Sequence, residues 1–385
     1  MKQSIKFALL VATMCGAGFA QDSSTQAATQ SSSPSPVAYV YVSSGTSSGN
    51  YKINEYSAAS NGALTPVPGS PISTNNVSDM ALNGKWLFGT NGTDIYSFSI
   101  ASNGALKQVS SINAQKYNAY DSGGPGALFL DHSGANLYDF DVNGDGTGNN
   151  EYQSFDINQD TGVLSYTGTT IDSADFETAL SFIGNNVDAY GAGCYHGDQS
   201  IYGFSRGGSG TLTELSTTPP IPAGPKGSVY CPYLAAADPT NHLAITLTPT
   251  NDGFSPTGPT QLGVYTASST GSLTTTSTDT NMPQIKVGNV YDIWMSPAGN
   301  LLAVAGSKGL QLFHFNGANP ITTYTGPITV NAITQMFWDN NNHLYAVSPA
   351  AGKLFVFTAT PTSYRQAPGS PYSITGAQNV IVLPK

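Results

Sequence analysis

Apolar and polar residues alternate along most of this chain, in short paired runs separated by a glycine-containing turn. The pattern is clearest over Ile95–Val109, IYSFSIASNGALKQV. Alternation with a period of two predicts a half-buried β-strand, and two such runs around Asn103-Gly104 predict a β-hairpin. Degenerate copies begin at Ile53, Tyr152, Ile201, Leu262, Leu310 and Leu354. An aromatic residue anchors each copy at an equivalent place: Tyr56, Phe98, Phe155, Phe204, Tyr265, Phe313 and Phe357.

A second repeated unit lies between these hairpins and consists of two apolar runs around a tight turn. Complete copies begin at Asp79, Ala127, Ala179, Tyr233, Asp292 and Gln335. A seventh copy is split, because Gln378 opens its first strand and Ala38 opens its second. This arrangement predicts an all-β fold, a seven-bladed β-propeller with four-stranded blades, whose ring is closed by a blade that shares N- and C-terminal strands. Such closure removes the free sheet edges that promote aggregation.

The order of strands within a blade, A to D, sorts the connections onto two faces. The A–B and C–D turns share one face, and all of them are short. The long connections are of the B–C and D–A types, so they share the opposite face: Asp141–Asn150, Thr217–Tyr230 and Thr248–Gln261. We call this the elaborated face. Long loops on a rigid scaffold are where function usually lies.

Composition supports this architecture and excludes some functions. Only 9% of the residues are charged and 42 are glycine, which disfavours a helical protein. The formal net charge of −10, with Arg206 and Arg365 as the only arginines, excludes nucleic-acid binding. Past residue 20, no stretch is apolar and long enough to span a bilayer. We expect a monomer.

The N-terminus has the pattern of an export signal. Residues 1–20 combine Lys2 and Lys6 with an apolar run and small residues, which predicts a cleavable signal peptide that ends before Gln21. Ala12-Thr13-Met14 is a poor lead-in for lipidation of Cys15, so a lipoprotein is disfavoured. Residues 21–36 are rich in Ser, Thr, Gln and Pro and predict a disordered linker, which leaves 37–385 as the propeller domain. A secreted or periplasmic location follows.

Several short motifs resemble one known family. They are the N-G-A-L-T hairpin, the Pro-Gly-Ser-Pro segments at Pro68–Pro71 and Pro368–Pro371, and the turn Ser296–Leu301. Together they resemble the lactonase-type, YVTN-like seven-bladed propellers of exported bacterial proteins, a group that includes 6-phosphogluconolactonase-like members. The resemblance implies the propeller scaffold and, for some members, lactone hydrolysis by a His and an Arg near a G-P-x-H-type segment. The nearest segment here, Gly124–Ala127, contains neither residue.

The stretch Asp139–Glu151, DFDVNGDGTGNNE, carries a candidate metal site. The D-x-N-x-D-G spacing resembles that of calcium-binding loops, in which alternate oxygen ligands point inward. We therefore predict that Ca²⁺ binds through Asp141, Asn143, Asp145, Thr147 and Glu151. The alternative is an ordinary polar turn, which Asp, Asn and Gly also favour.

Cys194 and Cys231 are the only cysteines beyond the predicted signal peptide. The repeat places both on the elaborated face, in adjacent blades. Export permits a disulfide between them, and we predict this bridge in preference to two free thiols.

Aligning the inner strands on their turns places polar residues at equivalent positions near the mouth of the central channel: Asp79, Glu177, Asp292, Gln335 and Asn379. His196 is the one histidine predicted on the elaborated face. These six residues are candidate ligands for a cation or a sugar-like polyol, and the alternative is a solvated channel lining. If the protein is an enzyme, Glu177, His196 and Asp292 are its candidate acid/base residues.

Three functions remain open. The one that we favour is a binding module, stabilised by calcium, for a small polar ligand or an extracytoplasmic protein or glycan partner. A hydrolase acting on a sugar-acid lactone is the second, and a structural cell-surface protein is the third. The missing His/Arg pair favours binding over catalysis.

Overall fold

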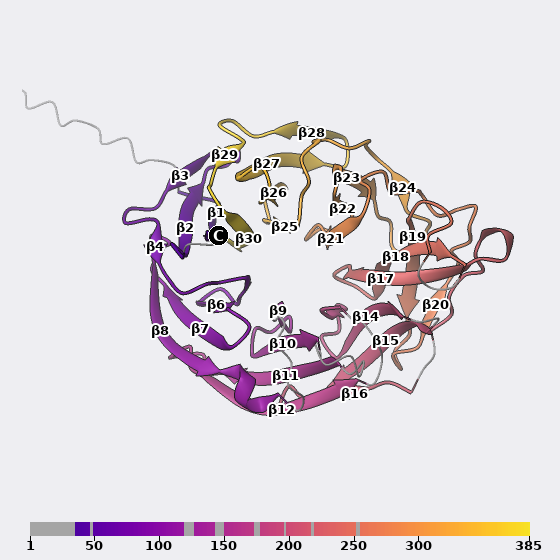
Figure 1. Cartoon of the computed structure of the whole chain (residues 1–385), viewed down its shortest axis with the longest axis horizontal. Coiled ribbons are helices and arrows are strands. Elements are labelled where there is room, and N and C mark those ends of the chain that lie inside the picture. The colour runs from indigo at the N-terminus through magenta and orange to yellow at the C-terminus, as the bar shows by residue number, and fades with distance from the viewer. Residues whose placement is uncertain are drawn as a thin grey trace, which may run out of the picture. The chain divides into compact units, whose positions relative to one another are not determined.

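The fold is given by a computed structural model, which describes residues 35–46, 49–118, 127–142, 150–172, 178–195, 198–216, 219–251 and 255–385. Residues 35–385 belong to one compact unit. Seven antiparallel sheets follow one another around a ring (Figure 1). The only helices among the described residues are two short 3₁₀ turns, η1 (Ala114–Tyr117) and η2 (Pro225–Gly227). None of the described helices has the length and apolarity that crossing a membrane requires.

Three blades follow one another in the first part of the chain, and we call them B, C and D. Blade B comprises β5 (Asp79–Leu82), β6 (Trp86–Thr90), β7 (Asp94–Ile100) and β8 (Leu106–Asn113). Blade C comprises β9 (Ala127–Leu130), β10 (Asn136–Val142), β11 (Asn150–Ile157) and β12 (Leu164–Asp172). Blade D comprises β13 (Ser181–Phe182), β14 (Asp188–Tyr195), β15 (Asp198–Arg206) and β16 (Leu212–Glu214).

Blades E, F and G continue the ring with the same order of strands. Blade E comprises β17 (Val229–Ala237), β18 (His242–Thr250), β19 (Gln261–Ala267) and β20 (Leu273–Thr275). Blade F comprises β21 (Val290–Met295), β22 (Leu301–Gly306), β23 (Gly309–His314) and β24 (Thr322–Thr323). Blade G comprises β25 (Gln335–Trp338), β26 (His343–Ser348), β27 (Lys353–Thr360) and β28 (Ser363–Gln366), and the short β29 (Tyr372–Ser373) also pairs with β27.

Blade A closes the ring and is built from both ends of the described chain. Its inner strand is β30 (Ala377–Pro384), followed outward by β1 (Ala38–Ser44), β2 (Lys52–Ala58) and β3 (Leu64–Pro66), while β4 (Ile72–Ser73) also pairs with β2. β1 and β30 are antiparallel, and Ala38 pairs with Pro384. The indigo and yellow ends of the chain therefore lie side by side in Figure 1. The predicted seven-bladed propeller and its shared closing blade are confirmed.

The predicted hairpins also form, with the glycine supplying the unusual backbone conformation. Gly104 has a φ of +87° in the turn between β7 and β8, and a Cβ there would lie 2.3 Å from the Tyr39 ring of blade A. Asn103 contributes differently, because its side-chain oxygen accepts a hydrogen bond from the Ala105 N–H. Glycine is therefore required for the turn and for its close approach to the neighbouring blade.

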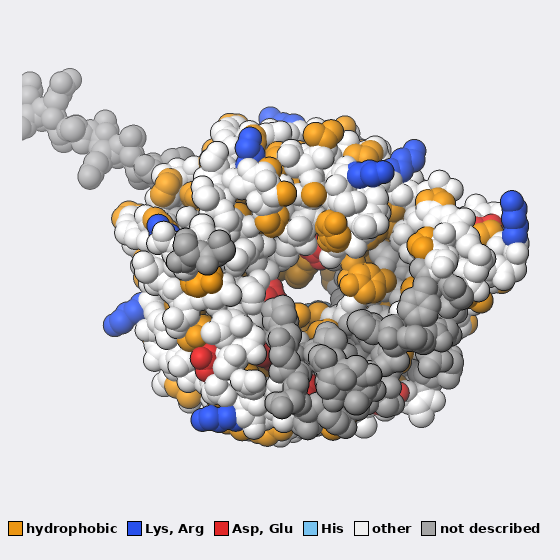
Figure 2. Space-filling view, in the orientation of Figure 1, with side chains coloured by type: hydrophobic (Ala, Val, Ile, Leu, Met, Phe, Trp, Pro, Cys, Tyr) orange, Lys and Arg blue, Asp and Glu red, His pale blue; other side chains and the backbone are white. Residues whose placement is uncertain are grey.

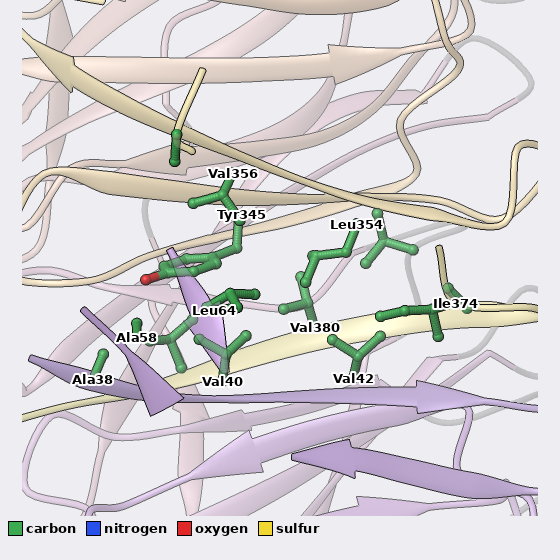
Figure 3. Close-up of a cluster of buried hydrophobic side chains, with 14 residues drawn as sticks. Ala38, Val40, Val42, Ala58, Leu64, Tyr345, Leu354, Val356, Ile374 and Val380 are labelled. Atoms are coloured by element: carbon green, nitrogen blue, oxygen red, sulfur yellow. The ribbon is translucent and has the colours of Figure 1, made fainter. Parts of the chain in front are cut away.

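Hydrophobic packing between adjacent blades forms the core. At the closure, Val40, Val42 and Val380 of blade A pack against Tyr345 and Val356 of blade G (Figure 3). Each of these five side chains is 0% exposed. Their burial supplies the main driving force that holds the last blade against the first.

Buried tyrosines add a directional contact to this packing. Tyr41, Tyr138 and Tyr190 each donate a hydrogen bond from the phenol to a glycine carbonyl of the next blade, at 3.0, 2.7 and 2.7 Å. In each case the glycine lies in the turn between the third and fourth strands of that blade. All three side chains are fully buried. The turns of one blade are thus fixed by the second strand of the blade before it.

Candidate functional site

Four of the predicted mouth residues lie at equivalent heights on four inner strands. Asp79 begins β5, Gln335 begins β25, and Asp292 and Asn379 are the third residues of β21 and β30. Each inner strand begins at the elaborated face, because the connection from the outer strand of the preceding blade arrives there. These residues therefore form a rim that we call the channel mouth. Asp79, Asp292 and Gln335 line a central channel of about 500 Å³. Figure 2 shows the hollow at the centre of the ring, with acidic and hydrophobic side chains around it.

Each mouth residue forms a hydrogen bond to the next inner strand. The Asp292 carboxylate accepts from the Met336 N–H at 2.8 Å, and the Gln335 side-chain oxygen accepts from the Val380 N–H at 2.7 Å. The relay continues around the ring: the Asn379 amide donates to Asp79, and the Asp79 carboxylate accepts from the Leu128 N–H at 2.7 Å. These side chains therefore connect adjacent blades by hydrogen bonds as well as lining the channel. Carboxylate oxygens have further acceptor capacity, so Asp79 and Asp292 can still bind a ligand.

Burial perturbs both carboxyl groups at the mouth. Desolvation raises the pKa of Asp79 from 3.8 to about 6, although hydrogen bonds from Leu128, Met80 and Asn379 partly offset it. Desolvation also raises the pKa of Asp292, to about 8, and the charge of Asp79 adds to this increase. At neutral pH Asp79 is therefore mainly ionised and Asp292 mainly protonated.

An aromatic wall lies directly below the mouth. Trp294 and Phe337 follow Asp292 and Gln335 by two residues on the same strands, so each aromatic side chain shares a sheet face with that polar residue, and all four residues line the channel. Their ring centroids are 4.6 Å apart at an interplanar angle of 50°. The Trp294 backbone is held by a hydrogen bond from the Trp338 indole N–H to its carbonyl, at 3.3 Å. This aromatic pair was not predicted from the sequence, although the Asp-x-Trp and Gln-x-Phe spacings carry a signal for it.

A network of polar contacts around Asp131 lies at the opposite end of the channel. The Arg206 guanidinium lies 3.5 Å from the Asp131 carboxylate and donates to the Asn186 carbonyl at 3.0 Å. His132, in the same turn, lines the channel, and burial lowers the pKa of its imidazole. Arg206 therefore links blades C and D on the face with short turns.

The predicted disulfide is confirmed. Cys194 in β14 and Cys231 in β17 are bonded, with 5.3 Å between their Cα atoms. Both lie toward the elaborated face, so the bridge ties blade D to blade E beside the channel mouth.

The remaining predicted residues lie partly or wholly outside the described residues. Glu177 and His196 are outside them, so their predicted places at the mouth and their predicted acid/base roles remain predictions. Of the predicted calcium ligands, Asn143, Asp145 and Thr147 are also outside.

The two ends of the predicted calcium loop are described by their backbone register. Asp141 in β10 pairs directly with Glu151 in β11. Glu151 is only 1% exposed. The register brings the first and last predicted ligands together, as a loop-type metal site requires.

Comparison with known proteins gives relatives in structure alone. No protein-family model and no curated protein sequence matches this chain. A solved structure of a protein from Lactobacillus plantarum has a TM-score of 0.66 at 15% identity, and the alignment covers 90% of this chain and 99% of that one. A candidate 6-phosphogluconolactonase from Bacteroides fragilis has a TM-score of 0.63 at 14% identity, and the alignment covers 91% of this chain and 99% of that one.

A third similar structure is the periplasmic gluconolactonase of Pseudomonas aeruginosa. Its TM-score is 0.51 at 14% identity, and the alignment covers 90% of this chain and 85% of that one. Identities this low show a shared fold and leave function to be argued from the site. The chain is thus a seven-bladed β-propeller whose structural neighbours include lactonase-like proteins.

Proposed function

We propose that this protein is a binding module that takes a small polar ligand into its central channel from the elaborated face. The observation that carries this proposal is the order of groups along the channel: two carboxyl groups at the mouth, then Trp294 and Phe337 directly below. A volume of about 500 Å³ suits a ligand of one or two rings. The carboxyl groups would fix the polar end of the ligand, and the aromatic faces would cover its apolar side.

Tryptophan fluorescence offers a direct test. The chain has three tryptophans, and Trp86 and Trp338 are 9% and 3% exposed, whereas Trp294 lines the channel. Titration of the purified protein with neutral sugars, sugar acids, sugar lactones and small amines should change the Trp294 emission for at least one of these classes. The Trp294→Phe variant should lose the signal, and Trp86→Phe should keep it. No response to any class would overturn the proposal.

A second candidate is lactone hydrolysis, favoured by the separated pKa values of Asp79 and Asp292 and by the names of two structural neighbours. Ionised Asp79 would take a proton from water as the water oxygen attacks the lactone carbonyl carbon. Protonated Asp292 would donate its proton to the ring oxygen as the carbon–oxygen bond breaks, which gives the open hydroxy acid.

The lactonase candidate has its own test. Hydrolysis of glucono-1,5-lactone, corrected for the uncatalysed rate, should follow a bell-shaped pH profile with limbs near pH 6 and pH 8. Asp79→Asn and Asp292→Asn should each lower the rate by at least about 100-fold. A corrected rate of zero would remove this candidate and leave the binding proposal standing.

We also propose that the protein is exported and that calcium stabilises the Asp141–Glu151 loop. Support for export comes from the predicted signal peptide, from the disulfide, which persists in oxidising compartments, and from the periplasmic neighbour. Cell fractionation should recover the chain outside the cytoplasm, and deletion of residues 1–20 should retain it inside.

A further inference from the structure

The channel has an unusual charge pattern, because its described lining contains no lysine or arginine. The carboxyl groups of Asp79 and Asp292 both line the channel without a basic partner in the described residues, and His132 at the far end is the only basic side chain in the described lining. On the face seen in Figure 2, the Lys and Arg side chains lie toward the outer circumference, away from the central hollow. The segments between the described ranges contain no Lys or Arg in their sequence beyond residue 34.

This pattern disfavours an anionic ligand. A phosphate or carboxylate entering the channel would approach Asp79 and Asp292 at low dielectric, where like charges repel strongly. It would also find no fork of arginine donors of the kind that usually binds such groups. A sugar phosphate is therefore a poor fit to the described site.

The aromatic pair points to the opposite charge. Trp294 and Phe337 lie one step below Asp292 and Gln335 on adjacent inner strands. Tryptophan is the side chain that attracts a cation most strongly through its ring face, and the attraction grows when the cation loses its water. A carboxyl group and an indole on the same strand face thus make a surface for an ammonium group that carries apolar substituents.

We propose that the channel ligand is a small organic cation, an ammonium group with an apolar body, held by Asp79 and Asp292 and covered by Trp294 and Phe337. This inference rests on the proposed binding function and specifies its ligand class. A metal ion suits the site less well, because Ca²⁺ requires six to eight oxygen ligands and the described residues contain no group of three or more His, Cys, Asp or Glu side chains placed to bind a metal.

The protonation of the mouth supports the same ligand. The pKa of Asp292 is raised because the carboxyl group is desolvated near ionised Asp79 and lacks a basic partner. A bound ammonium group would favour the ionised form, so binding at pH 7 should release protons and become tighter toward pH 9. Besides Asp79 on β5, the titratable groups in the described lining are Asp131 and His132, both at the far end of the channel.

A matched pair of probes tests the inference on the full-length protein. Choline carries a permanent charge, and 3,3-dimethylbutan-1-ol is its neutral isostere, so the two differ only in charge. Isothermal titration calorimetry at pH 8 should show choline binding at least about tenfold more tightly than the alcohol. Gluconate serves as the anionic probe. CaCl₂ serves as the metal probe and is titrated into the Asp141→Ala variant, so that the predicted calcium loop does not contribute. Both should bind more weakly than choline.

Variants separate the contributions of charge and of the ring. Asp292→Asn and Trp294→Leu should each weaken choline binding by about tenfold or more, whereas Trp294→Phe should retain part of the affinity. The exposed Asp160→Asn serves as the matched surface control and should bind as the wild type does. Circular dichroism checks that each variant is folded.

The possible failures are distinguishable. Equal affinity for choline and its neutral isostere, or tighter binding of gluconate, would overturn the cation assignment while the binding function stands. Tighter binding of CaCl₂ than of choline to the Asp141→Ala variant would replace the organic cation with a metal. If none of these probes binds and no class in the wider panel changes the Trp294 emission, the binding function falls together with the inference.

Discussion

Replacement of Asp292 by asparagine should change how the stability of the protein depends on pH. The carboxyl group of Asp292 has a pKa of about 8 in the folded protein, against an ordinary value of 3.8. Between these values the folded state keeps a proton that the unfolded state has lost. The unfolding free energy of the wild type therefore decreases as pH rises through this window, and the decrease is complete above pH 8. Asparagine does not titrate, and its side-chain oxygen can still accept from the Met336 N–H.

The magnitude follows from the width of the window. One bound proton changes the unfolding free energy by about 1.4 kcal/mol per pH unit, so the three units from pH 5 to pH 8 give an upper limit of about 4 kcal/mol. Asp292 retains partial solvent access at the channel mouth, which lowers the desolvation penalty. We expect the variant to gain about 1–4 kcal/mol on the wild type over this range.

Urea denaturation at pH 5, 6, 7 and 8 measures this difference directly. All other titrating groups are common to both proteins, so their effects largely cancel in the comparison. Asp160→Asn, at an exposed turn, should follow the wild type at every pH. Parallel curves for Asp292→Asn and the wild type would show that Asp292 ionises normally in the folded state, which would refute the reasoning.

Three further changes probe the scaffold. Tyr190→Phe removes a buried 2.7 Å hydrogen bond and should lower the free energy of unfolding, measured by urea denaturation, by about 1–3 kcal/mol. Tyr364→Phe, at a residue 48% exposed, should leave it almost unchanged. Equal decreases in the two variants would contradict the role of Tyr190 in holding adjacent blades together. Replacement of Cys194 and Cys231 by serine should lower the free energy of unfolding by about 2–4 kcal/mol and make the melting temperature insensitive to dithiothreitol. Continued sensitivity to dithiothreitol would show that this disulfide is not the bond that dithiothreitol reduces. Calcium at 100 times its Kd should stabilise the protein by about 2.7 kcal/mol relative to chelator, and Asp141→Ala should abolish the gain; identical melts in calcium and chelator would remove the metal site.

The blade count and the closure could be predicted because both depend on local pattern. Period-two alternation and glycine turns specify each hairpin without reference to its neighbours, as Asn103-Gly104 shows. Because one repeat is split between the two chain ends, those ends were predicted to pair within one blade. The pairing of β1 with β30 confirms this prediction.

The site was predicted less completely, because its chemistry depends on contacts between blades. Alignment of the inner strands on their turns placed Asp79, Asp292 and Gln335 at one height, and the channel lining includes all three. Their hydrogen bonds to the next inner strand depend on how the blades stack, which the pattern within one blade does not encode. Trp294 was missed for a related reason, because an aromatic residue in a strand is as typical of a core as of a channel wall.

The pairing of β30 with β1 also sets an order on biosynthesis. β1 is made early and β30 late, so the inner edge of β1 keeps unpaired N–H and C=O groups throughout translation. The channel wall stays incomplete until β30 takes its place beside β25 and β5. We therefore expect products that stop before Ala377 to aggregate through the open edge, so that premature termination would remove the protein from the cell instead of leaving a weakened propeller.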